Sequence, residues 1–262
     1  MTSSCGARGV VEPLQGYKNP SESSGSRLIQ SVLTPAIRFW LGTQVDHADD
    51  LAIEIQSRDR QILKGYIPSI QLAADRICYQ GLSLGRLVVS ATDIRVNWWG
   101  IARGQPLQLL APIPVEALMC LSEADLNRSL QVEMFAQALT DLMAHDLLSI
   151  FNPNVETTDS STLSNPSIDR IELRTDAIVM AIALTDGDRT THHYVLSKLV
   201  LKDGHRLGFH QPQLLDHTNA VEGRSLPQLE EFSIDLGETV ELTSLDITPG
   251  QLLCQGTIWV QP

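Results

Sequence analysis

The chain has 262 residues, of which 43% are hydrophobic, and its formal net charge is −12. This length and composition suffice for a substantial core, and we expect one large domain. The negative charge argues against a nucleic-acid partner, because that kind of binding depends on Lys and Arg contacts to phosphates.

The N-terminal region and the cysteines predict a cytoplasmic protein, with peripheral attachment to a membrane as an open alternative. Residues 1–26 are rich in Ser, Gly and Pro and have no apolar signal, which is typical of a disordered tail. The four cysteines are too far apart for a CxxC pair, so a reducing compartment is the default. No segment approaches the roughly 20 apolar residues of a spanning helix. No polybasic run is visible either, so any membrane contact is expected to use apolar and aromatic side chains.

The first predicted element is an amphipathic helix over residues 27–42. Its apolar residues recur at i, i+3 and i+4, which favours a helix packed on a sheet. Pro35 lies inside this pattern, so we expect a kink or break near Leu33. Leu33, Ile37 and Trp40 are candidate lipid-binding residues, chosen from this periodicity alone.

Short segments with alternating apolar residues follow the helix and predict an antiparallel sheet. The predicted strands are 50–56, 62–66, 70–74 and 87–96, with turns at 58–60, 81–85 and 97–100. Trp98 and Trp99 in the last turn are candidate membrane-contacting residues, since amphipathic rings at a turn suit a bilayer surface. Neighbouring residues point in opposite directions, so one of the two is expected in the core.

Ser122 and Asp125 have the spacing of a capping box and predict the start of a second helix, followed by a further helical segment after residue 132. Leu126 and Leu130 of this helix are further candidate lipid-binding residues. A polar linker at 152–167 separates the two halves of a single predicted domain, 27–262. The second half is mostly strand, with hairpin signals at Asp186-Gly187 and Asp203-Gly204.

Two motifs suggest chemistry, but their surroundings argue against it. Residues 81–85 match the GxSxG pattern with Ser83 in the nucleophile position, yet a β-rich segment follows where the motif requires a helix. A serine hydrolase is therefore disfavoured. His192 and His193 are neighbours in a predicted strand and point to opposite faces, so they cannot ligate one metal ion together. We expect no catalytic residue, metal or other cofactor.

Six short segments occur in a characteristic order along the chain. They are Ile67-Pro68-Ser69-Ile70, Tyr79-Gln80-Gly81-Leu82, Thr92-Asp93-Ile94-Arg95-Val96-Asn97, Arg103-Gly104-Gln105-Pro106-Leu107, Leu121-Ser122-Glu123-Ala124-Asp125-Leu126-Asn127 and Gly256-Thr257-Ile258-Trp259-Val260. This ordered set resembles the LmeA-like phospholipid-binding family, especially its cyanobacterial branch, from about Leu28 to the C-terminus. Asp125-Leu126-Asn127 is its most telling part.

The resemblance implies an α+β fold related to the tubular lipid-binding (TULIP-like) proteins. In that fold a strongly curved antiparallel sheet wraps around one long or kinked helix, and additional helices lie between two sheet halves. The implied function is non-catalytic binding of a phospholipid or other acyl lipid in an apolar groove, as a carrier or a membrane-associated factor. A groove filled by the protein's own side chains or by a partner helix would instead make the chain an interaction or assembly module. An open apolar cavity between helix and sheet distinguishes the two hypotheses.

Overall fold

The computed structural model describes residues 32–44, 46–79, 82–132, 166–186 and 189–262. The predicted tail and nearly all of the predicted linker lie outside these residues, as does the helical segment predicted after residue 132. The chain divides into two compact units. Unit 1 comprises Met1–Cys120, Thr239–Thr243 and Cys254–Pro262, and unit 2 comprises Leu121–Glu238 and Ser244–Leu253. We describe each unit by itself.

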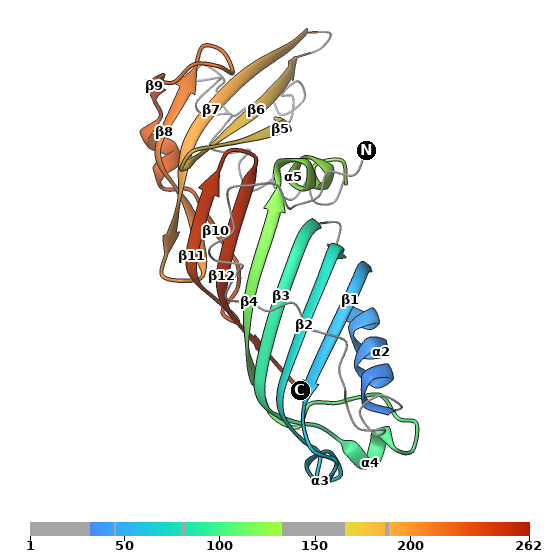
Figure 1. Cartoon of the computed structure of the whole chain (residues 1–262). Coiled ribbons are helices and arrows are strands. Elements are labelled where there is room, and N and C mark those ends of the chain that lie inside the picture. Colours follow the sequence, from blue (N-terminus) through green and yellow to red (C-terminus); the bar gives the residue numbers. More distant parts are fainter. Residues whose placement is uncertain (1–31, 45, 80–81, 133–165, 187–188) are drawn as a thin grey trace, which may run out of the picture. The chain divides into compact units, whose positions relative to one another are not determined.

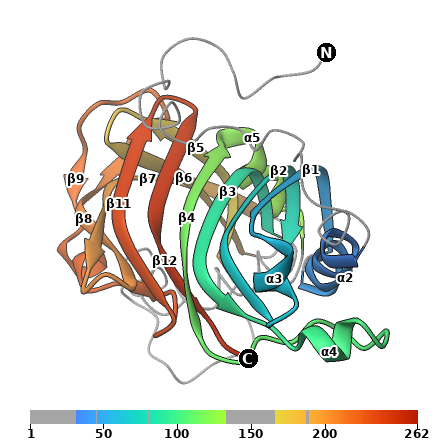
Figure 2. The same cartoon turned by 60° about the horizontal axis from the view of Figure 1, so that its bottom comes forward.

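Unit 1 is built on a sheet with the strand order β1-β2-β3-β4-β12-β11 (Figure 1). Its strands are β1 (His47–Gln56), β2 (Tyr66–Tyr79), β3 (Leu82–Arg95), β4 (Ile113–Ser122), β11 (Val240–Thr248) and β12 (Gln251–Val260). The last two strands contribute residues to both units. Helix α2 (Thr34–Gln44) lies beside β1 (Figure 2).

The strand register gathers apolar side chains on one face of this sheet. Because side chains alternate along a strand, cross-strand partners share a face. Two rungs of that face are Ile55–Ile70–Ala91 and Ile53–Leu72–Val89. Leu33 and Ile37 of the helical segment belong to the same buried cluster as these isoleucines. The core of unit 1 therefore lies between α2 and this face.

Pro35 is the second residue of α2, and Val32 and Leu33 directly before this helix are π-helical, so the helical segment continues on both sides of the proline. The residues before Val32 lie outside the described part of the chain. The length of the predicted helix and its kink therefore stay predictions.

Two predicted elements of unit 1 turn out to be short helices, and the predicted turn at 81–85 is also wrong because residues 82–85 belong to β3. The predicted strand 62–66 is the end of α3 (Asp59–Ile62) and a turn, closed by hydrogen bonds from the Ile62 and Leu63 amides to preceding carbonyls. The predicted turn at 97–100 is mostly α4 (Trp98–Ile101). In α3 and in α4 a single helical turn buries one large side chain, Ile62 or Trp98. A short apolar segment in a sequence fits such a helical turn as well as it fits the end of a strand.

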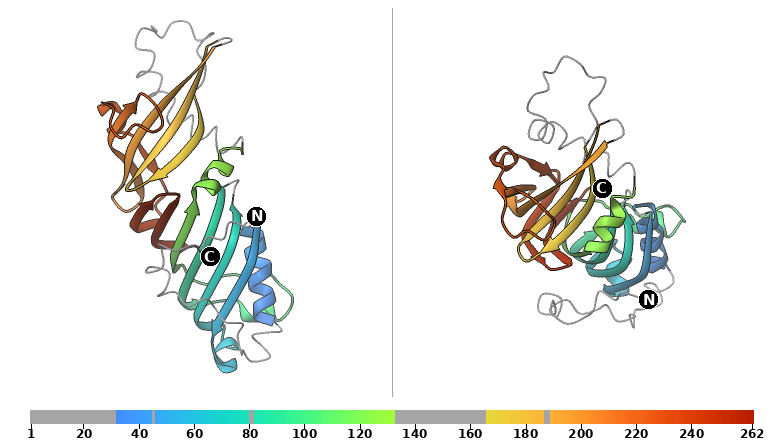
Figure 3. Two further views of the ribbon diagram at one scale, coloured as in Figure 1. Left: turned by 45° about the horizontal axis from the view of Figure 1, so that its top comes forward. Right: turned by 90° about the horizontal axis from the view of Figure 1, so that it is seen from above.

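Unit 2 contains a second sheet with the order β10-β8-β7-β6-β5, to which β9 adds beside β8 (Figure 3). Its elements are α5 (Glu123–Ser129), β5 (Ser167–Arg174), β6 (Ala177–Asp186), β7 (Arg189–Lys202), β8 (Arg206–Leu215), β9 (Arg224–Ser225), the 3₁₀ helix η2 (Pro227–Glu230) and β10 (Ser233–Asp235). All strand pairs with a described register in either unit are antiparallel, which confirms the predicted sheet type.

The strands β5, β6, β7 and β8 pair with one another in the order in which they follow along the chain. Asp203 and Gly204 connect β7 to β8 with φ angles of 54° and 74°, so the predicted turn at this position is confirmed. Asp186 and Arg189 are cross-strand partners at the end of β6 and the start of β7, and Gly187 of the other predicted turn lies outside the described residues.

Candidate functional site

Unit 1 contains a groove of about 1100 Å³ beside α2. This volume is slightly above the roughly 300–1,000 Å³ that is usual for ligand pockets. The apolar lining residues are Leu41, Ala48, Leu51, Ala52, Ile53, Leu72, Ala74, Ile77, Leu87 and Val89, and the others are Thr34, Arg38, Gly42, Asp46, His47, Asp49 and Asp50. The groove is thus largely apolar along β1, β2 and β3, and polar where β1 begins.

Periodicity explains which residues reach the groove. Leu72 and Ala74 alternate along β2, and their partners on β3 are Val89 and Leu87. On α2 the lining residues Thr34, Arg38 and Leu41 are spaced by four and three positions, so they form one stripe of the helix. Leu72, Leu87 and Val89 are only half-buried, so they leave apolar surface open to the groove.

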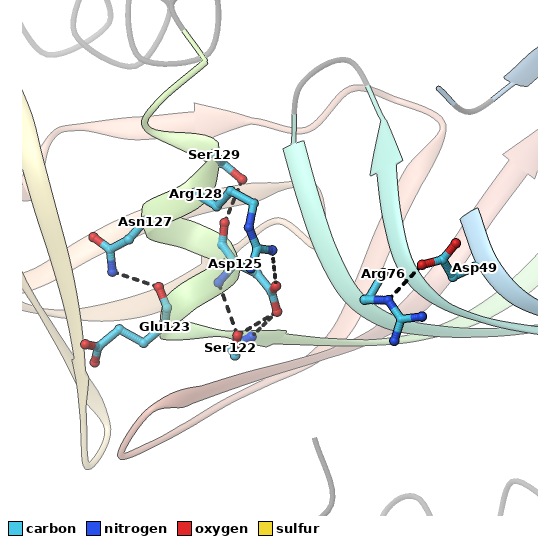
Figure 4. Close-up of polar contacts among 8 residues, drawn as sticks. All are labelled: Asp49, Arg76, Ser122, Glu123, Asp125, Asn127, Arg128 and Ser129. Carbon is cyan, nitrogen blue, oxygen red and sulfur yellow. Dashed lines mark hydrogen bonds and ion pairs between the residues drawn. The ribbon is translucent and has the colours of Figure 1, made fainter. Parts of the chain in front are cut away.

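The polar end of the groove contains a network of ion pairs. Arg76 Nε lies 2.8 Å from Asp49 Oδ2 and Arg76 Nη2 lies 3.4 Å from Asp50 Oδ2, while His47 Nε2 lies 2.9 Å from Asp49 Oδ1. Figure 4 shows the contact between Arg76 and Asp49. Arg38 Nη2 on α2 donates to the Leu51 carbonyl of β1 at 3.2 Å, so this arginine links two elements that line the groove.

The backbone at this end is irregular. The pairing of β1 with β2 shifts on both sides of Asp49, as in a β-bulge. Asp50 and Arg76 have φ angles of 49° and 48°, which non-glycine residues seldom adopt. Such conformations are concentrated at functional sites, because the rest of the fold must impose them. This end of the groove therefore combines charged side chains with an unusual backbone, as a site for a polar group would.

The Asp49–Arg76 contact predicts a measurable acid titration. The hydrogen bond from Arg76 lowers the pKa of Asp49, an effect that burial opposes only in part. A carboxyl whose folded pKa is lowered stabilises the fold above its unfolded pKa, and this stabilisation is lost as pH falls through the folded value. In ¹³C NMR titrations we expect Arg76→Gln to raise the pKa of Asp49 towards the ordinary value. Arg60→Gln, outside the groove, should leave it unchanged; equal pKa values in all three proteins would contradict the assignment.

The three predicted lipid-binding residues of the first helix lie next to the groove but are not part of its lining. Leu33 and Ile37 are 0% and 5% exposed and pack in the core, and Trp40 is half-buried against that core. They hold α2 on the sheet, while the neighbouring stripe of the helix faces the groove. Direct lipid contact by these three residues stays a prediction.

The other predicted site residues lie elsewhere. Leu126 is half-buried in α5 and Leu130 is buried directly after it, both in unit 2. Of the two neighbouring tryptophans, Trp98 is 4% exposed and belongs to the core, whereas Trp99 is 67% exposed. Only Trp99 therefore has the accessibility that a membrane contact needs.

The polar residues around Asp125 begin α5. Ser122 Oγ accepts from the Asp125 amide at 3.1 Å, and Asp125 Oδ2 accepts from the Ser122 amide at 3.0 Å, so the predicted capping box is confirmed (Figure 4). Asp125 Oδ1 also accepts from Arg128 Nη1 at 2.9 Å. The carboxyl of Asp125 is thus used by the helix itself.

Glu123 and Asn127, one helical turn apart, hold the outer edge of β5. Asn127 Nδ2 donates to the Ile171 carbonyl at 2.7 Å and Asn127 Oδ1 accepts from the Ile171 amide at 2.9 Å. Glu123 Oε2 accepts from the Leu173 amide at 3.0 Å. Because β5 ends its sheet, these side chains replace a missing neighbouring strand.

The catalytic alternative lacks the geometry that it requires. Ser83 and Gly85 lie inside β3, so no strand-turn-helix elbow forms around Ser83. In the part of the chain that the structure describes, no group of three or more His, Cys, Asp or Glu side chains is placed to hold a metal ion. None of the described helices is long and apolar enough to cross a membrane.

A family model described as LmeA-like phospholipid-binding matches residues 25–257, a range that includes every residue lining the groove. No curated protein and no solved structure matches the chain.

Proposed function

Since the chain belongs to the LmeA-like phospholipid-binding family, we propose that the groove of unit 1 binds the acyl chain of a phospholipid or a similar lipid. The proposed role is non-catalytic, as a lipid carrier or a membrane-associated factor. The observation that carries the proposal is the apolar lining of the groove along β1–β3, with half-buried Leu72, Leu87 and Val89. The proposed arrangement is the one expected of a tubular lipid-binding fold, with hydrocarbon between a helix and the face of a sheet.

Burial of hydrocarbon supplies the affinity in this proposal. Each CH₂ group transferred from water into an apolar site contributes about 0.8 kcal/mol. Covering Leu72 and Val89 also removes protein apolar surface from water. A polar headgroup would remain at the end of the groove where β1 begins. There Arg38 offers a guanidinium suited to a phosphate oxygen, beside the carboxylates of Asp46 and Asp49.

Filling the groove provides a direct test. Val89→Trp places a large ring on the apolar face of β3, and we expect it to reduce co-purifying acyl lipid at least tenfold. Thr92→Trp is the matched control, because Thr92 is exposed and lies on the opposite face of the same strand. Lipid in natively purified protein is measured by extraction and mass spectrometry, with circular dichroism to verify the fold.

Leu72→Gln makes the same face polar without adding bulk, and should also lower lipid content if Val89→Trp fails to fold. Wild-type protein that contains no acyl lipid and takes up none from vesicles would contradict the proposal. That result would favour the interaction-module hypothesis. Equal lipid content in Val89→Trp and Thr92→Trp, both folded, would show that lipid binds outside the groove.

A further inference from the structure

Two connecting segments meet at one end of the strands of unit 1. Residues 57–65 contain α3 and the turn into β2, and residues 95–112 contain α4 and its flanks. The Val96 amide donates to the Gly65 carbonyl at 2.8 Å, and the Leu110 amide donates to the Arg95 carbonyl at 2.9 Å. In Figure 1, α3 and α4 lie at the same end of β2 and β3. The two segments therefore form one surface.

This surface exposes large apolar side chains. Leu63, Trp99 and Leu110 are 45%, 67% and 61% exposed, and they are three of the seven exposed large hydrophobic residues in the described chain. The neighbouring Trp98 is buried, which anchors the short helix that presents Trp99. Apolar side chains that gather on one part of a folded surface mark interaction sites, and these three lie on two segments joined by a hydrogen bond.

The same surface is basic in an acidic protein. The two segments contain five basic residues, all exposed, and one acidic residue, Asp59, so their formal net charge is +4 while that of the chain is −12. The basic residues are Arg58, Arg60, Lys64, Arg95 and Arg103. None of them takes part in an ion pair with another described residue. Their charge is therefore available to an anionic partner.

We propose that this surface docks the protein on an anionic phospholipid bilayer. We call it the tip patch, made of Leu63, Trp99, Leu110 and the five basic residues. An amphipathic indole ring prefers the headgroup region of a membrane, and Lys and Arg near a bilayer are attracted to anionic lipids. The net charge of +4 on the two segments, in a chain of net charge −12, favours an anionic bilayer as the partner.

The inference goes beyond lipid binding in the groove, because no residue of the tip patch lines it. It also adds basic side chains to the expected membrane contact through apolar and aromatic residues. The basic residues of 57–65 and 95–112 are separated in sequence and form no polybasic run. The fold brings them together.

Vesicle sedimentation tests the proposal, with phosphatidylcholine vesicles compared with vesicles that contain phosphatidylglycerol. Wild-type protein should bind the anionic vesicles at least tenfold more tightly, with affinity falling as salt rises. Trp99→Ser should weaken this binding about tenfold, and Arg60→Glu with Lys64→Glu should abolish the preference for anionic lipid. The controls are Trp259→Ser, an exposed tryptophan on β12, and Arg189→Glu with Lys198→Glu on β7.

The membrane proposal is supported if the control variants bind vesicles like wild type. If Val89→Trp also still binds vesicles, the tip patch acts independently of the groove. Equal binding by wild type, Trp99→Ser and the Arg60/Lys64 variant would overturn it. Absence of wild-type binding to either vesicle would also overturn it. A Trp99→Ser variant that changes only the oligomeric state would assign the surface to protein contacts instead and overturn the membrane proposal.

Discussion

Asn127→Leu is expected to destabilise unit 2 by roughly 3 kcal/mol. The change removes both hydrogen bonds to Ile171 and leaves the amide and carbonyl of this buried residue without their partner. Each unsatisfied buried polar group costs about 1–3 kcal/mol. Urea unfolding measures the loss, and hydrogen exchange at the Ile171 amide localises it. We expect exchange at this amide to become much faster.

The control for this prediction is Ala124→Leu, which introduces the same residue at an exposed position of the same helix. It should change stability by less than about 0.5 kcal/mol. Because an open strand edge invites pairing with another chain, Asn127→Leu should also aggregate more readily. Unchanged protection of the Ile171 amide in Asn127→Leu would contradict the proposed role of this side chain.

The sequence predicted that Asp125-Leu126-Asn127 lies at the start of a helix, but it did not predict what Asn127 contacts. Its capping box depends on residues three positions apart, so local spacing revealed it. The partner of Asn127 is Ile171, 44 residues further along the chain. No local sequence pattern identifies a side chain that takes the place of a neighbouring strand, because only the fold brings Asn127 next to Ile171.

Strand periodicity predicted most of the antiparallel sheet, because apolar and polar residues alternate along a strand that buries one of its faces. It failed at α3, where Ile62 and Leu63 resemble a strand by composition. Four residues are too few for helical periodicity to appear. The deciding contact is tertiary: Gly65, with φ of 73°, ends the turn and pairs with Val96.

The predicted lipid-binding residues of the first helix stay predictions, and the residues that line the groove on this helix are their neighbours Thr34, Arg38 and Leu41. Leu33 and Ile37 are the most buried residues of the helical segment, so the apolar periodicity marks the stripe that fills the core. An accessible groove is lined by residues at the border of that stripe, such as Arg38 and Leu41. This mixed polar and apolar border is the signal that would have identified them.

Gly65→Ala is expected to lower the stability of unit 1 by roughly 3 kcal/mol. A Cβ at this position would lie 2.5 Å from the carbonyl oxygen of Val96, and the φ of 73° disfavours any side chain. The backbone conformation accounts for about 1–2 kcal/mol and the clash with a fixed backbone atom for about 1–3 kcal/mol. Thermal or urea unfolding monitored by intrinsic tryptophan fluorescence measures the change.

Gly104→Ala separates these two causes. Gly104 has a similar φ of 80°, but a Cβ there would meet nothing within 4 Å, so this variant should lose only about 1 kcal/mol. Gly65 also joins the two segments of the tip patch through its bond with Val96. Gly65→Ala should therefore weaken binding to anionic vesicles at temperatures where the protein is still folded, while Gly104→Ala should bind like wild type. Equal stability losses in Gly65→Ala and Gly104→Ala would mean that the Val96 carbonyl moves aside without cost. In that case the contact between Gly65 and Val96 would not determine the geometry of the tip patch.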